Sequence, residues 1–167
     1  MTGSPSSGDK REIAMNTEMI YMVWGVLAGA LFLALLAWVS ITDATKRNIP
    51  NLAILIMLII GILNTVIAAI SGQAWWWYPA GTMIALPFML LWFRGKMGAG
   101  DAKLMLVCGL FLGLQASLLM AGLMLVILLV IAAYLYFKHM SLKTRIPLGP
   151  VLSLTSGIMI TLNIVLS

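Results

Sequence analysis

Six apolar segments follow one another from residue 20 almost to the end of the chain. They cover approximately residues 20–42, 51–70, 75–93, 102–115, 117–137 and 148–166. A helix needs about 20 predominantly apolar residues to cross a hydrocarbon core of about 30 Å. Because 62% of the residues are hydrophobic and only 9% are charged, the chain has too little polar surface to coat a soluble globule. The pattern predicts an all-α integral membrane protein, a bundle of about six transmembrane helices.

The basic residues between these segments are unevenly distributed. Eight basic residues lie in or beside the first, third and fifth connections: Lys46, Arg47, Arg94, Lys96, Lys103, Lys138, Lys143 and Arg145. The second and fourth connections contain no basic residue. Cytoplasmic loops carry such an excess of Lys and Arg. We therefore expect these three connections in the cytoplasm and both termini outside. Because the net charge of +5 is dispersed in this way, membrane lipids are the expected partner and nucleic acid is not.

Residues 1–18 differ in composition from the rest of the chain. The stretch before Met15 is polar and contains several Ser and Gly residues, with no apolar core that could be a signal peptide or a span. We expect residues 1–18 to form a disordered N-terminal tail, and the part before Met15 to be a sequence added to the natural protein. We expect residues 19–167 to form a single transmembrane domain.

Only two acidic side chains, Asp43 and Asp101, occur after residue 18. An ionisable group at bilayer depth is costly unless it pairs, neutralises or faces water, so it marks a functional site by default. Asp43 precedes the first cytoplasmic connection and Asp101 closes the next one, which predicts both carboxylates on the same membrane face. Paired aspartates can hydrolyse an amide, because the ionised member accepts a proton from water while the protonated member donates one to the carbonyl oxygen.

Other readings of the two aspartates stay open from the residues alone. Asp43 could pair with Lys46 or Arg47, three and four positions later on the same helix face, and Asp101 could cap the helix that follows it. The lone His139 and the lone Cys108 supply no triad and no metal-ligand spacing. We expect no metal and no cofactor.

Three motifs carry a resemblance to a known family. Asp43 is followed by Pro50-Asn51 in an Asp-x6-Pro-Asn pattern, Gly98 to Asp101 form a Gly-x-Gly-Asp motif, and Pro147 to Pro150 read Pro-x-Gly-Pro. Together they resemble the signature of the type IV prepilin peptidases, over essentially residues 20–166. The resemblance implies an intramembrane aspartic endopeptidase of the bacterial or archaeal cytoplasmic membrane. It would remove the leader of prepilin-like substrates at the cytoplasmic face.

The resemblance also implies roles for individual residues. Asp43 and Asp101 would be the catalytic pair. The residues that support the site or line a substrate groove would be Arg47, Pro50, Asn51, Gly98, Gly100, Lys103, Pro147, Gly149 and Pro150. Many members carry a cytoplasmic insertion with Cys pairs and also methylate the new N-terminus. The first connection here is short and those cysteines are missing, so N-methyltransferase activity is not expected and the chain is more similar to the compact Tad/Flp pilus type.

Two further function classes remain as alternatives. In one, the chain is a small proton- or cation-coupled transporter or channel with Asp43 and Asp101 as its ion site. In the other, it is a structural subunit of a secretion or pilus machine and catalyses nothing. The residues also predict which aspartate ionises first: Asp101 at a helix N-terminus gains from the positive end of the helix dipole, whereas Asp43 near a helix C-terminus does not. This argument makes Asp101 the more readily ionised member.

Overall fold

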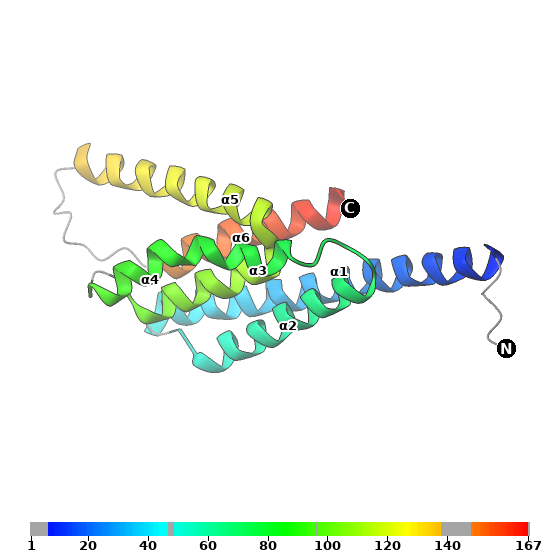
Figure 1. Cartoon of the computed structure of the whole chain (residues 1–167). Helices are drawn as coiled ribbons and strands as arrows, with labels where there is room; N and C mark the ends of the chain where they lie inside the picture. Colours follow the sequence, from blue (N-terminus) through cyan, green and yellow to red (C-terminus); the bar gives the residue numbers. More distant parts are fainter. Residues whose placement is uncertain (1–6, 47–48, 96, 138–147, 167) are drawn as a thin grey trace.

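The computed structural model describes residues 7–46, 49–95, 97–137 and 148–166, and within these ranges every regular element is helical. The long helices are α1 (Ser7–Lys46), α2 (Asn51–Ile70), α5 (Ala99–Phe137) and α6 (Leu148–Leu166). Between α2 and α5 lie three short helical pieces, α3 (Trp77–Gly81), the 3₁₀ helix η1 (Thr82–Ala85) and α4 (Leu86–Phe93). The prediction of an all-α fold is confirmed (Figure 1).

Three helices are long and apolar enough to cross a membrane. They are Met15–Lys46 in α1, all of α2, and Ala99–Tyr134 in α5. Two shorter apolar stretches, Trp77–Phe93 and Gly149–Leu162, accompany them. The chain is thus a multi-pass membrane protein, while the number of about six spans and the orientation of the termini stay predictions.

The helix α1 begins earlier in the chain than the sequence suggested. Residues 7–18, which we expected in a disordered tail, continue the membrane-spanning part of α1 as helix. A preformed helix extends at little cost, because each added residue gains one hydrogen bond. The prediction of a single domain over residues 19–167 remains a prediction.

A glycine divides α5 into two arms. Gly113 has φ 75° and ψ 174°, which is outside the helical region, and its positive φ favours glycine over other residues. Figure 1 shows the two halves of α5 leaving this point in different directions. The break falls at the predicted boundary between the fourth and fifth apolar segments.

The core lies where α1, α2, the first arm of α5 and α6 meet. Its largest fully buried side chains include Phe32, Met57, Leu104 and Leu152. The rings of Phe32 and Phe111 stack with centroids 4.2 Å apart. Where α3 ends and η1 begins, the chain packs closely on α5, since a β-carbon at Gly81 would come within 2.9 Å of the Gly109 carbonyl carbon. Small residues allow such close helix contact in membranes.

The ends of the helices gather in a way that matters for the site. Figure 1 shows the first residues of α1 and the last residues of α6 at one side of the bundle. The end of α1 and the starts of α2, α5 and α6 lie toward the opposite side. Asp43 and Asp101 belong to this second group of helix ends.

Candidate active site

Asp43 lies in the last turns of α1 and is 9% exposed. Its Oδ2 accepts a hydrogen bond of 3.1 Å from the backbone N–H of Gly149, at the start of α6. A buried carboxylate needs such a partner, since an unpaired charge in a medium of low dielectric is costly. The contact therefore fixes the end of α1 against the beginning of α6.

Gly149 is in direct contact with Asp43. A β-carbon at this position would come within 2.8 Å of Asp43 Cγ and closer still to Oδ2. Separations below 3.0 Å are essentially never seen for real β-carbons. Any other residue at position 149 must displace the carboxylate or the helix start.

Asp101 lies in the first turn of α5 and is half-buried. Its carboxyl group is close enough to that of Asp43 for a direct electrostatic interaction. The fold thus brings together two acidic residues that are 58 positions apart in the sequence. Because α5 begins at Ala99, Asp101 is inside the first turn and not at the capping position that we considered for it.

The two glycines before Asp101 have different neighbours. A β-carbon at Gly98 would lie 3.2 Å from Asp101 Oδ2, whereas one at Gly100 would press on the side chain of Ile49 at 3.0 Å. Ile49 is 8% exposed and belongs to the core. The loop between α4 and α5 therefore lies against both the carboxylate and the chain that enters α2.

The other predicted supporting residues lie at the same group of helix ends. Lys103 Nζ donates a 3.4 Å hydrogen bond to Asn51 Oδ1, and both side chains are exposed. The carbonyl of Pro50 accepts the N–H of Ala53 and so starts α2. Pro150 is half-buried in the first turn of α6. Arg47 and Pro147 lie outside the described residues, as do Lys96, Lys138, His139, Lys143 and Arg145.

The sequence left open an ion pair between Asp43 and Lys46 or Arg47, and the structure gives Asp43 a different partner. The hydrogen-bond partner of Asp43 is the Gly149 backbone, while the side chain of Lys46 is exposed. The Gly149 contact was not expected from the sequence, which marked Gly149 only as a supporting residue. The sequence did contain a hint of this contact. At the start of a helix, Gly149 has no side chain to block an acceptor, and Pro150 has no N–H of its own to offer to it.

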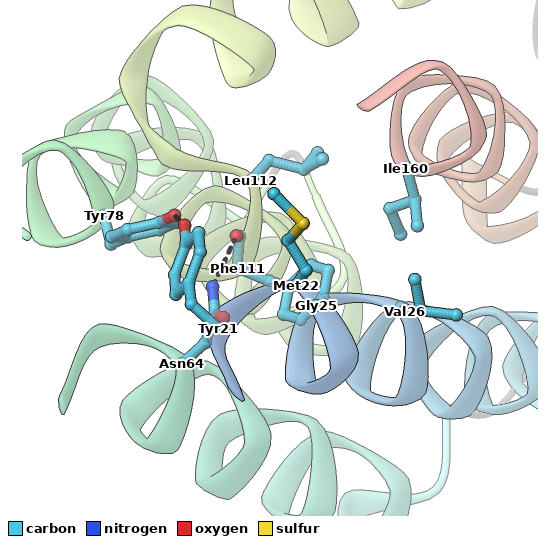
Figure 2. A pocket seen from close by; sticks show the side chains of 10 residues that line it. Tyr21, Met22, Gly25, Val26, Asn64, Tyr78, Phe111, Leu112 and Ile160 are labelled. Atoms are coloured by element: carbon cyan, nitrogen blue, oxygen red, sulfur yellow. Dashed lines mark hydrogen bonds between the residues drawn. The ribbon is translucent and has the colours of Figure 1, made fainter. Parts of the chain in front are cut away.

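A second polar cluster lies at the far end of the bundle. Figure 2 shows Tyr21 and Tyr78 with their hydroxyl groups hydrogen-bonded to one another, and Asn64 close to them. Asn64 Nδ2 donates to the carbonyl of Phe111 at 3.5 Å. These residues line a cavity of about 150 Å³, and Tyr21 and Tyr78 also line a second cavity of about 210 Å³.

These cavities are remote from the aspartates. Tyr21 and Asp43 are 22 positions apart on α1, which is about 33 Å at 1.5 Å per residue. Sequence reasoning missed this cluster, although a lone amide such as Asn64 in an otherwise apolar helix could have pointed to it. Both of these cavities are thus distant from the two aspartates.

Two carboxyl groups in electrostatic range have a defined chemical capacity. When one is protonated and the other ionised, the pair can accept a proton from water and donate one to a carbonyl oxygen. Asp43 is buried and Asp101 is half-buried. Such surroundings strengthen electrostatic interactions relative to bulk water.

Comparison with known proteins identifies the family of the chain. No curated protein and no solved structure matches the chain. The family model described as the type IV leader peptidase family matches residues 30–137, which include Asp43, Gly98, Gly100 and Asp101. The resemblance to prepilin peptidases is thereby confirmed. Since the match covers more than half of the chain, the protein belongs to the type IV leader peptidase family.

Proposed function

We propose that the chain is an intramembrane aspartic endopeptidase that removes the leader of Flp-type prepilin-like proteins at the cytoplasmic membrane face. Membership in the leader peptidase family supports a prepilin peptidase role in general. The observation that carries the finer proposal is the electrostatic proximity of Asp43 and Asp101, the two acidic residues that follow residue 18. In this proposal the two aspartates are the catalytic residues.

The reaction needs only water and the two carboxyl groups. Water attacks the scissile carbonyl carbon while one carboxylate takes its proton and the other carboxyl group donates a proton to the carbonyl oxygen. The amine then leaves with a proton returned by the first group. The proposal includes no metal and no cofactor.

The substrate is a single apolar helix with a polar leader. Its scissile junction must unwind locally, because the backbone groups of a helix are already hydrogen-bonded and shielded. Gly98, the residue before α5, lies close to the Asp101 carboxylate, so we infer that the extended junction lies beside Gly98 and the first turn of α5. The basic connections support a cytoplasmic site in an inner membrane.

Two activities are not part of this proposal. N-methylation of the new N-terminus is left out because the chain lacks an insertion with Cys pairs and has Cys108 as its one cysteine. Ion transport through Asp43 and Asp101 is not favoured, since the family match points to a peptidase. A purely structural role for the aspartates predicts that their substitution changes stability and leaves processing intact.

The test is co-expression of an Flp-type prepilin with the wild type, Asp43→Asn or Asp101→Asn. Leader removal is followed as a mass shift of the substrate. Glu18→Gln is the matched control, because it neutralises an exposed acidic residue outside the site. Processing by the wild type and the control alone, with all variants inserted in the membrane, supports the aspartic pair. Processing that persists in either Asp→Asn variant contradicts it.

A further inference from the structure

The hydrogen bond between Gly149 and Asp43 joins a carboxylate to the start of a helix. Gly149 is the second residue of α6, a helix of 19 residues. The first four N–H groups of a helix have no partner within it, and Pro150 supplies no N–H at all. The N–H of Gly149 is therefore free to donate to Asp43 Oδ2, and it does so at 3.1 Å.

This contact favours the ionised form of Asp43. A hydrogen bond to an anionic oxygen is about twice as strong as one to a neutral oxygen, and the N-terminal end of a helix carries positive partial charge. In contrast, no hydrogen bond from the described residues reaches the Asp101 carboxyl group. The carboxyl group of Asp101 therefore lacks the direct stabilisation that Asp43 has.

Among the residues that the structure describes, the charged groups near the pair do not reverse this difference. On α1, Lys46 is exposed, and on α5 the ammonium group of Lys103 bonds to Asn51. The first turns of α2 and α6 contain no acidic residue. Asp101 interacts electrostatically with Asp43, and two carboxylates that interact in this way do not both ionise easily.

We propose that Gly149 is a positioning residue whose backbone N–H holds Asp43 as the ionised member of the pair, so that Asp43 is the general base and Asp101 the general acid. This inference rests on the proposed peptidase function. The sequence alone suggested the opposite order, because it considered only the helix that each aspartate belongs to. The beginning of α6 reaches Asp43 from elsewhere in the chain and changes the balance.

The assignment gives each proton a path. Asp43 takes a proton from the attacking water, whose oxygen bonds to the scissile carbonyl carbon. Asp101 gives its proton to the carbonyl oxygen, which yields a tetrahedral diol. When the C–N bond breaks, Asp43 returns its proton to the leaving nitrogen and a diol hydroxyl returns one to Asp101. Both carboxyl groups then have their initial protonation states.

The test measures protonation and does not depend on catalysis. In the purified full-length protein, infrared difference spectroscopy follows the carboxyl C=O stretch with pH in Asp101→Asn, where Asp43 remains, and in Asp43→Asn, where Asp101 remains. Asp43 is expected to protonate at lower pH than Asp101, because the N–H of Gly149 donates to its carboxylate and a hydrogen bond to an anionic oxygen is the stronger one. The reverse order overturns the proposal.

Gly149→Ala isolates the contribution of the helix start. Added to Asp101→Asn, it is expected to raise the midpoint of Asp43, because its β-carbon displaces the carboxylate. Added to Asp43→Asn, it should leave the midpoint of Asp101 unchanged. Gly157→Ala on the same helix is the control, since its β-carbon would meet Leu33 at an ordinary 3.5 Å.

Equal shifts of both aspartates, or no shift of Asp43, contradict the role of Gly149. If Gly149→Ala does not fold, the order of the midpoints in the two single variants still decides which aspartate is the anion. Failure of the peptidase function itself would be seen in the co-expression experiment, as a prepilin that the wild type does not process. The two proposals can therefore fail independently.

Discussion

Gly149 donates its backbone N–H to Asp43 Oδ2 across 106 positions of sequence, and it has no room for a β-carbon beside that carboxylate. The contact links the end of α1 to the beginning of α6. It positions the side chain of one proposed catalytic residue through a glycine that lies outside residues 30–137, the stretch matched by the family.

Gly149→Ala should lower the rate of leader cleavage by about tenfold or more. Its β-carbon would overlap Asp43 and displace the proposed base, and a misplacement of about 1 Å can cost about 100-fold in rate. The measurement is the initial cleavage rate of a purified prepilin in detergent. Gly157→Ala is expected to cleave like the wild type; equal rates for both variants would refute the importance of the Asp43 contact.

The cleavage rate should depend on pH as a bell-shaped curve. At low pH the base of the pair becomes protonated and cannot accept a proton from water, so the rate falls. At high pH the acid loses the proton that it must donate, so the rate falls again. Initial rates across a pH series, with stability of the enzyme checked at each pH, provide the measurement. A rate that only rises toward high pH would argue against a shared-proton pair.

Asn51→Ala and Lys103→Ala should each change stability by less than about 1 kcal/mol. Their hydrogen bond is 3.4 Å long and lies between exposed side chains, and exposed pairs of this kind contribute little. A double-mutant cycle by thermal unfolding in detergent measures the coupling. A coupling well above this value would mean that the pair is buried by substrate, lipid or another part of the chain.

Gly113→Ala should destabilise the protein by about 1–2 kcal/mol. The residue has φ 75°, a conformation that costs an L-residue about this much. Gly122→Ala on the same helix is the matched control, because its β-carbon would meet nothing within 4 Å and alanine favours helix. Thermal unfolding in the same detergent compares the two. Equal melting temperatures would show that α5 does not need its break.

Tyr21→Phe should weaken the fold slightly and leave leader cleavage unchanged. The substitution removes the hydrogen bond with Tyr78, which contributes about 1 kcal/mol, at a position on α1 that is 22 residues before Asp43. Cleavage rate and melting temperature measured together test this. A large loss of cleavage with normal stability would instead connect the cavity at Tyr21 and Asn64 to the reaction.

The helical elements follow the sequence closely because each depends on local properties. Apolar segments such as residues 51–70 match α2 at both ends, since Pro50 prevents an earlier start and Ser71-Gly72 ends the helix. The boundary near Gly113 was also predictable, because glycine tolerates a positive φ. The beginning of α1 was not, since helix propagation carried it through a polar stretch down to Ser7.

The sequence by itself determined the class of the protein and its candidate aspartates. Long apolar segments permit only membrane helices, and two isolated carboxyl groups in such a chain must have a function or a partner. Only the tertiary structure decided that the beginning of α6 reaches Asp43, that the first turn of α5 packs against Ile49 at Gly100, and that the two cavities lie away from the aspartates. Contacts of this kind depend on helix packing between distant segments, which the pattern along a single segment does not encode.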